Sequence, residues 1–173
     1  MSDKPTLNVA LVGYAFMGRA HSNAYRQVNR YFPDCPYQVV PKVLVGRSAG
    51  PLKEAAEQLG WEETSTNLDA VLARKDIDIV DIVTPGHTHA EIAVAALEAG
   101  KHVLCEKPVA YNFTDTRRAA ALAVAKGLKT KLGFTFRYAP AMRYMKSLID
   151  EGFIGTPFIF NGYEQNSQWL DPQ

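Results

Sequence analysis

The chain has 173 residues, of which 47% are hydrophobic and 21% are charged. This composition supports a folded core and argues against disorder, and the length suits one domain and part of a second. The net charge of +1 gives no reason to expect a nucleic acid or an acidic membrane surface as partner, and no apolar run is long enough to span a bilayer. The polar N-terminus lacks a signal-peptide core, and Cys35 and Cys105 do not suggest a disulfide framework, so we expect a cytoplasmic protein.

The first predicted elements are an apolar strand over 7–12, the turn GYAFMG over 13–18, and a helix that follows at once. A dinucleotide pyrophosphate binds at such a junction, where a tight turn leads into a helix N-terminus with free N–H groups. Gly13 suits the turn, and Gly18 allows the helix to pack closely on the strand. Ala15 replaces the usual middle glycine, and its methyl group limits the approach of phosphates. An ordinary strand-to-helix turn is the alternative, which the later strand–helix alternation disfavours.

The rest of the chain alternates between strands and helices. We predict Pro51 at the first position of one helix, Thr88 and Glu91 as a capping box of another, Thr114 as the cap of a third, and a loop over 29–36. The alternation predicts an α/β fold with a Rossmann-type doubly wound parallel sheet over 1–131, followed over 132–173 by the start of a second, α+β domain. The further strands are predicted over 38–45, 77–83, 102–105, 131–136 and 155–163, and the further helices over 51–59, 68–73, 88–99, 114–126 and 140–151.

The end of the second strand is where a dinucleotide presents its adenosine ribose. An acidic residue there would hydrogen-bond both ribose hydroxyls, whereas this chain has Arg47 and Ser48 and no acid. A guanidinium and a hydroxyl suit a 2′-phosphate, so the pair favours NADP over NAD. Alternatively, Arg47 stacks on the adenine ring, which would suit NAD equally.

Glu106, Lys107 and Pro108 directly follow the predicted strand HVLC. A lysine at the carboxyl end of a parallel strand faces the crevice where ligands bind. Its ammonium could hydrogen-bond a substrate hydroxyl or stabilise a developing alkoxide, with Glu106 orienting it or contacting the nicotinamide ribose. Pro108 fixes the turn, as a cis peptide in one reading. Taken alone, the tripeptide is better explained as an ordinary strand end with a surface lysine.

Three stretches together resemble the glucose–fructose oxidoreductase/inositol dehydrogenase (Gfo/Idh/MocA) family. They are VGYAFMGRAHSNAY from 12, DIVTPGHTHAEIAVAALEAGKHVLCEKPVA from 81, and GFTFRYAPAMRYMKSLIDEGFIGTP from 133. Within the family, the sequence is most similar to sugar dehydrogenases of the levoglucosan or inositol type. The resemblance implies an NAD- or NADP-dependent enzyme that moves a hydride between a carbinol carbon of a sugar or polyol and the nicotinamide.

The resemblance also implies roles for particular residues. Lys107 would be the catalytic or substrate-orienting residue, and Tyr138, Gln165 and Trp169 would reach the sugar, in a segment that also holds Asp171. Trp169 is equally well explained as an anchor in a loop. The cofactor would contact Gly13, Ala15, Phe16, Met17, Gly18, Thr84, Pro85, His87, Glu106 and Arg137, besides Arg47 and Ser48.

The four histidines have competing explanations. His21 either faces the cofactor cleft or is a satisfied structural residue, and the second is favoured; His102 is expected to be structural. His87 and His89 flank a helix start, but neither has a carboxylate or cysteine partner at ligand spacing, so no metal site is expected.

The sequence departs from the family pattern in its length. Members run well beyond 300 residues, and their second domain supplies a catalytic histidine, the substrate site and a sheet for homo-oligomerisation; no residue here matches that histidine. The apolar residues 158–160 lie on a predicted strand without partners. Either the chain is part of a longer enzyme, which we favour, or that strand pairs with another chain. In the alternative function, the chain is a non-catalytic dinucleotide-binding or partner-assembly module.

Overall fold

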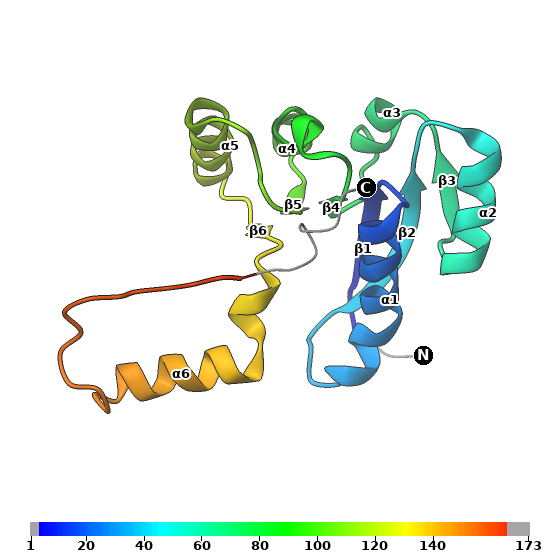
Figure 1. Cartoon of the computed structure of the whole chain (residues 1–173). Helices are drawn as coiled ribbons and strands as arrows, with labels where there is room; N and C mark the ends of the chain where they lie inside the picture. Colours follow the sequence, from blue (N-terminus) through cyan, green and yellow to red (C-terminus); the bar gives the residue numbers. More distant parts are fainter. Residues whose placement is uncertain (1–3, 166–173) are drawn as a thin grey trace. The chain divides into compact units, whose positions relative to one another are not determined.

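The computed structural model describes residues 4–165. The chain forms two compact units, Met1–Phe134 and Thr135–Gln173, called here the first and the second unit. In the first unit, strands and helices alternate along the sequence (Figure 1). Its elements are β1 (Thr6–Val12), α1 (Phe16–Tyr31), β2 (Gln38–Val45), α2 (Ala49–Leu59), β3 (Glu63–Ser65), α3 (Leu68–Leu72), β4 (Ile79–Ile82), α4 (His89–Glu98), β5 (His102–Cys105), α5 (Phe113–Ala125) and β6 (Thr130–Leu132), with a 3-10 turn over Gly86–Thr88.

The six strands form one parallel sheet in the order β3-β2-β1-β4-β5-β6. The order reverses between β1 and β4, so the connections after these two strands leave the sheet in opposite directions. A crevice opens at the carboxyl ends of strands where this happens. The predicted Rossmann-type doubly wound sheet is therefore confirmed.

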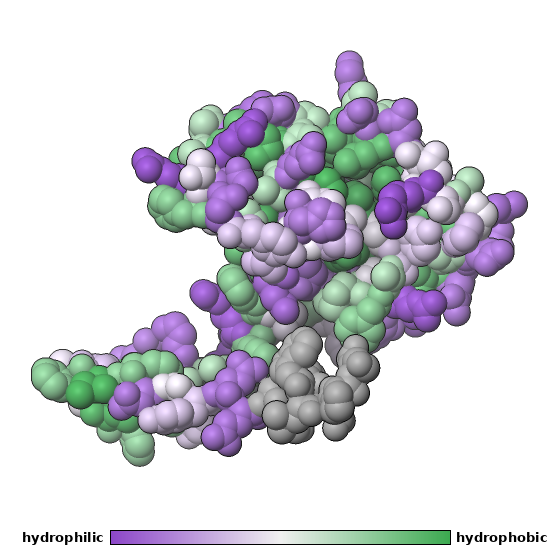
Figure 2. All heavy atoms as spheres, turned by 45° about the horizontal axis from the view of Figure 1, so that its top comes forward, coloured by the Kyte–Doolittle hydropathy of each residue, from purple (hydrophilic) through white to green (hydrophobic). Residues whose placement is uncertain are grey.

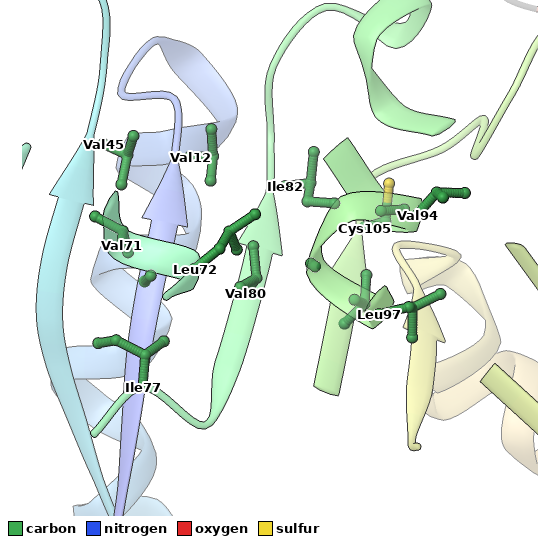
Figure 3. Close-up of a cluster of buried hydrophobic side chains, with 14 of the residues drawn as sticks. Val12, Val45, Val71, Leu72, Ile77, Val80, Ile82, Val94, Leu97 and Cys105 are labelled. Carbon is green, nitrogen blue, oxygen red and sulfur yellow. The ribbon is translucent and has the colours of Figure 1, made fainter. Parts of the chain in front are cut away.

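Apolar side chains cover both faces of the sheet. On one face, Val9 and Leu11 of β1 pack with Leu52 and Leu59 of α2. On the other, Ala10 and Val12 belong to a larger cluster with α3, α4 and α5, because successive residues of a strand point to opposite faces. Each fully buried leucine, isoleucine or valine contributes roughly 1.5–3 kcal/mol. Figure 3 shows part of this larger cluster, including Val12, Val45, Val71, Leu72, Ile77, Val80, Ile82, Val94, Leu97 and Cys105.

A chain of hydrogen bonds joins α1 to the segment after α2. The Ser22 hydroxyl donates to the Gly18 carbonyl at 2.6 Å, and the Trp61 indole N–H donates to the Ser22 hydroxyl at 2.9 Å. Trp61 is buried, and Tyr25 of α1 meets its ring edge-on at 6.0 Å between centroids. These contacts fix the first turns of α1 relative to the rest of that face.

Several predicted helix starts were wrong. Pro51 is the third residue of α2 and not the first; the N–H groups of the first turn have no intrahelical partner, so proline is tolerated there too. The Thr88 hydroxyl donates to the Pro85 carbonyl and does not cap α4, because the 3-10 turn places Thr88 in a helical conformation. Asn112, not Thr114, caps α5, its side chain accepting from the Asp115 N–H at 2.9 Å.

Strand and loop bounds also differ from the predictions in places. The loop predicted over 29–36 begins later, because α1 continues to Tyr31 and the Asn29 side chain bonds the N–H and carbonyl of Val39 at the start of β2. β4 and β6 are shorter than the predicted strands over 77–83 and 131–136, and each pairs with only three or four residues of the short strand β5. The edge strand β3 was not predicted.

The second unit contains a 3-10 turn (Thr135–Tyr138) and α6 (Pro140–Asp150), which confirms the predicted linking helix. The predicted strand over 155–163 was wrong, because these residues have no partner strand among those that the structure describes. Their large apolar side chains are exposed, with Phe158 at 94% and Phe160 at 87%. Figure 2 shows exposed apolar side chains in green. Within residues 4–165, no helix combines the length and the apolar character that crossing a bilayer requires.

Candidate functional site

The turn between β1 and α1 depends on its two glycines. Gly13 has a φ of +108°, which side chains disfavour, and its N–H donates to the Val45 carbonyl at 2.9 Å. A Cβ on Gly18 would lie 2.6 Å from the Gly13 carbonyl oxygen, closer than real contacts allow. The structure thus gives Gly13 the tight turn and Gly18 the close helix–strand packing that the sequence predicts for them.

The N-terminus of α1 offers unused hydrogen-bond donors. Its cap residue Ala15 makes no side-chain capping bond, and the first turn contains no acidic residue. The N–H groups of this turn have no intrahelical acceptor, and the helix dipole places partial positive charge beside them. An anionic group is therefore favoured at this end of the helix.

A cleft of about 560 Å³ opens beside this turn, at the carboxyl ends of β1, β2 and β4. Seven of the predicted cofactor residues line it: Gly13, Ala15, Arg47, Ser48, Thr84, Pro85 and His87. Phe16, Met17 and Gly18 are not among its lining residues, and neither are Glu106 and Lys107. The cleft thus brings together Gly13 and Ala15, predicted for the pyrophosphate, with Arg47 and Ser48, predicted for the adenosine ribose.

Some residues of the cleft have no role predicted from the sequence. The Tyr14 ring packs over Gly46, where a Cβ would lie 2.3 Å from the ring. Thr66 follows β3, the strand that was not predicted, and Ile92 lies one turn into α4. A place for Tyr14 at the cleft could have been predicted, because this residue lies within the turn over 13–18. Thr66 reaches the site only through the pairing of β3 with β2.

Arg47 and Ser48 form the corner of the cleft that follows β2. Both residues are exposed, and Ser48 is the N-cap residue of α2 but makes no side-chain capping bond. Among residues 4–165, no carboxylate forms an ion pair with Arg47. A guanidinium and a hydroxyl at this corner are therefore available to a ligand.

The loops after β4 and β5 are joined by His89. Its side chain is almost completely buried, with Nε2 2.6 Å from the Thr84 carbonyl oxygen and Nδ1 2.7 Å from that of Pro108. The Thr84 and Thr88 hydroxyls are 2.7 Å apart, which braces the first of these loops. His89 is therefore held by protein groups and does not face the cleft.

The turn after β5 holds a buried acid next to an exposed lysine. Glu106 is 6% exposed, its N–H donates to the Ile82 carbonyl, and its Oε2 accepts from the Lys107 N–H at 3.1 Å. The peptide bond between Lys107 and Pro108 is cis. A Cβ on Gly133 would lie 2.4 Å from Oε1 of Glu106, so only glycine leaves room for this carboxylate.

His21 connects Glu106 to a second buried acid that the sequence analysis did not place in the site. His21 Nδ1 lies 2.8 Å from Asp81 Oδ2, and Nε2 lies 3.3 Å from Glu106 Oε1. The Tyr25 hydroxyl donates to the same Asp81 oxygen at 2.8 Å. Burial lowers the pKa of His21, but the hydrogen bonds and charges of Asp81 and Glu106 outweigh it, so the pKa is raised. The favoured interpretation of His21 as a satisfied side chain agrees with these bonds.

The remaining predicted residues lie in the second unit. Arg137 and Tyr138 line a separate hollow of about 340 Å³ with residues of α6, and Gln165 is exposed. Trp169 and Asp171 lie outside the described residues. Within residues 4–165, no group of three or more histidine, cysteine or acidic side chains is arranged to hold a metal ion.

Residues 7–134 match the Gfo/Idh/MocA family, described as an oxidoreductase family with an NAD-binding Rossmann fold. The chain belongs to this family. The match runs from the second residue of β1 past the end of β6 and so includes every residue of the cleft.

Two curated relatives illustrate the similarity. The chain is 38% identical over 166 residues to a levoglucosan dehydrogenase of Pseudarthrobacter phenanthrenivorans, covering 96% of this chain and 43% of the relative. It is 33% identical over 162 residues to inositol 2-dehydrogenase 3 of Saccharopolyspora erythraea, covering 93% of this chain and 46% of the relative. The chain thus spans less than half the length of these relatives.

Solved structures agree with the family assignment. An oxidoreductase domain protein from Kribbella flavida superposes with a TM-score of 0.84 at 46% identity, covering 88% of this chain and 41% of that one. A levoglucosan dehydrogenase in complex with NADH and levoglucosan gives a TM-score of 0.84 at 39% identity, covering 87% of this chain and 40% of that one.

Proposed function

We propose that this chain is the cofactor-binding part of an NAD- or NADP-dependent dehydrogenase that acts on a sugar or polyol. The observation that carries the proposal is the cleft at the carboxyl ends of β1, β2 and β4, which the open N-terminus of α1 borders. The pyrophosphate would lie against the turn over 13–18, where the helix N-terminus compensates its charge. Thr84, Pro85 and His87 would form the opposite wall.

The adenosine end of the cofactor would reach Arg47 and Ser48. Among residues 4–165 the guanidinium has no ion-pair partner and the hydroxyl makes no capping bond, so both suit a 2′-phosphate and support NADP. The solved levoglucosan dehydrogenase was described with NADH, which supports NAD. We retain NADP as the proposed preference, because none of the described residues that line this cleft is a carboxylate that could bind the two ribose hydroxyls.

Lys107 would act at the other end of the cofactor, where bound nicotinamide supplies the hydride acceptor. Its ammonium would donate a hydrogen bond to the substrate oxygen and stabilise negative charge as the carbinol is oxidised. Glu106 would orient this lysine or contact the nicotinamide ribose. In the intact protein, Arg137, Tyr138, Gln165 and Trp169 would add contacts to nicotinamide or substrate, and we expect the polypeptide to form a homo-oligomer in the cytoplasm.

The first test is a titration of the purified chain with NADH and with NADPH, followed by nicotinamide fluorescence. We expect saturable binding of both, with NADPH the tighter ligand. Arg47→Ala should weaken NADPH by about tenfold, which is the worth of one charge-assisted hydrogen bond, and leave NADH unchanged.

Other outcomes of this titration separate the parts of the proposal. Tighter binding of NADH, with no change in Arg47→Ala, would exclude the 2′-phosphate role and keep the dehydrogenase. A chain that is folded by circular dichroism but binds neither nucleotide would contradict the cofactor function. Binding of both nucleotides without turnover of levoglucosan or inositol, in a protein that also carries the family's second domain, would favour a non-catalytic module.

A further inference from the structure

Two histidines on opposite faces of the sheet meet the same short turn after β5. His21 lies on α1, whose Met17 and Tyr25 pack in the cluster on one face. His89 starts α4, whose side chains belong to the cluster on the other face. His21 contacts Glu106 at the start of the turn, and His89 contacts the Pro108 carbonyl at its end. Lys107 is the residue between these two attachment points.

Both ring nitrogens of His21 face atoms that only accept hydrogen bonds. A carboxylate has no proton to donate, and a neutral imidazole donates from one nitrogen only. Bonds to Asp81 Oδ2 and Glu106 Oε1 at the same time therefore need the imidazolium form of His21. His89 places its two ring nitrogens beside the carbonyl oxygens of Pro108 and Thr84.

The charges of the two neighbouring acids favour the imidazolium form of His21. Both acids are buried: Asp81 lies on β4, and Glu106 directly follows the neighbouring parallel strand β5. Two carboxylates so placed repel each other, and a cation between them removes this repulsion. The raised pKa of His21 agrees with this arrangement.

The neighbouring Tyr25 and Cys105 side chains carry no positive charge. The Tyr25 hydroxyl donates to Asp81 and has a raised pKa, owing to burial and to the Asp81 charge. Burial, with the charges of Asp81 and Glu106, raises the pKa of the Cys105 thiol to about 12, which keeps it neutral. His21 is therefore the cation that these described neighbours provide for the two acids.

We propose that His21 and His89 are positioning residues for Lys107, His21 through the Glu106 carboxylate and His89 through the Pro108 carbonyl. The imidazolium of His21 fixes Glu106 Oε1, which leaves Oε2 to accept from the Lys107 N–H. His89 ties the far end of the turn to Thr84, on the wall of the cleft. This inference rests on the proposed function insofar as Lys107 acts beside the nicotinamide.

Amide side chains can test each contact separately. The amide nitrogen of asparagine takes the place of histidine Nδ1, and that of glutamine takes the place of Nε2. His21→Asn therefore keeps the bond to Asp81 and loses the one to Glu106, whereas His21→Gln does the reverse. For His89 the order is inverted: His89→Asn keeps the bond to Pro108, and His89→Gln keeps only the bond to Thr84.

The first readout needs no cofactor. Hydrogen exchange of the Lys107 amide, measured by NMR relative to the Glu106 amide in the sheet, reports the order of the turn. We expect the ratio to rise about tenfold in His21→Asn and to stay near that of wild type in His21→Gln, because one charge-assisted hydrogen bond is worth about that factor. If His21 only compensates Asp81, His21→Asn will keep the wild-type ratio and His21→Gln will be the less stable variant, which overturns the proposal.

The second readout compares NADH with ADP, which lacks the nicotinamide half. The proposal predicts that His21→Asn weakens NADH by about tenfold, that His21→Gln restores most of the affinity, and that both variants bind ADP like wild type. An unchanged NADH affinity in His21→Asn contradicts the positioning role. If wild type binds neither nucleotide, the proposed function fails, and the Lys107 exchange ratio still decides whether the histidines order the turn.

The His89 pair supplies the crossed control. A positioning role predicts that His89→Asn and His21→Gln each preserve the Lys107 exchange ratio. The preferred amide thus differs between the two positions, which loss of packing alone does not produce. If glutamine or asparagine is the better substitute at both positions, the proposal is wrong. His89 is almost completely buried, so its variants are the more prone to unfold. If they do unfold, the two His21 variants decide the test.

Discussion

The two units of the chain differ in how far their apolar residues are buried. All the buried hydrophobic residues that the structure describes lie in the first unit, whereas from 135 to 165 none is buried. Each strand of the first unit has a neighbour, but the apolar segment 155–163, which the sequence predicts as a strand, remains outside any sheet. α6 nevertheless forms, since a helix satisfies its backbone groups within itself while a strand needs a partner. α6 thus forms without a buried apolar side chain, whereas 155–163 has no partner strand among the described residues and forms no strand.

The largest test of this difference removes one apolar side chain from each unit. Leu11 is fully buried in the central strand β1, so Leu11→Ala should lower the free energy of unfolding by about 2–5 kcal/mol. Phe158→Ala removes a larger but exposed side chain and should change it by less than about 0.5 kcal/mol. Urea denaturation followed by far-UV circular dichroism measures both. Similar losses would mean that the second unit contributes to the same core.

A smaller effect is expected from a single added methyl group in the turn after β1. Gly18→Ala places a Cβ 2.6 Å from the Gly13 carbonyl oxygen, so α1 must move away from the strand, at a cost of about 1–3 kcal/mol. Gly50→Ala is the matched control, because its Cβ meets nothing within 4 Å. Thermal unfolding compares the two variants. A Gly18→Ala protein as stable as the control would show that the turn is loosely packed.

The helix caps sharpen the comparison further. Asn112→Ala removes the side-chain cap of α5 and should cost about 1 kcal/mol, whereas Thr114→Ala should be nearly neutral. In the second unit, α6 begins after Ala139, which forms no capping bond. Ala139→Asn should therefore raise helix content without changing the unfolding free energy of the first unit. A stabilised first unit would show that the two units unfold together.

The pH dependence of stability is the finest of these tests. The raised pKa of His21 means that its stabilising contribution is complete below about pH 6.5 and is lost as the pH rises through the raised value. Stability from urea denaturation should therefore fall over this window, and His21→Gln, which does not titrate there, should lack this part of the decrease. An identical decrease in both proteins would assign it to other groups.

The sequence predicts the central part of the fold well. Gln38–Val45 and His102–Cys105 match their predicted bounds, because apolar residues predominate in both segments and a turn follows each. β3 escaped prediction because Glu63–Ser65 is a short, polar edge strand that β2 recruits. The segment 155–163 failed for the opposite reason: its pattern is that of a strand, but strand formation depends on residues elsewhere.

The candidate site divides in the same way. Gly13 and Ala15 of the turn and the residues of the loop after β4 form local motifs, so their place at the cleft follows from the sequence. The hydrogen bonds of His21 with Asp81 and Glu106 join three segments that are distant in the sequence, so no local sequence pattern predicts them. Likewise, the need for glycine at 133 becomes visible only when the Glu106 carboxylate is seen beside it.

The hydrogen bonds from Trp61 through Ser22 to Gly18 give the protein a natural optical probe. The chain has two tryptophans, Trp61 and Trp169, so Trp169→Phe would leave a single emitter. The Trp61 indole is buried, and its N–H donates to the Ser22 hydroxyl, which donates to the carbonyl of Gly18 at the end of the turn over 13–18. A ligand that shifts the first turn of α1 would change the environment of this indole. Its emission wavelength and lifetime can therefore report occupancy of the turn by nucleotides that carry no fluorophore.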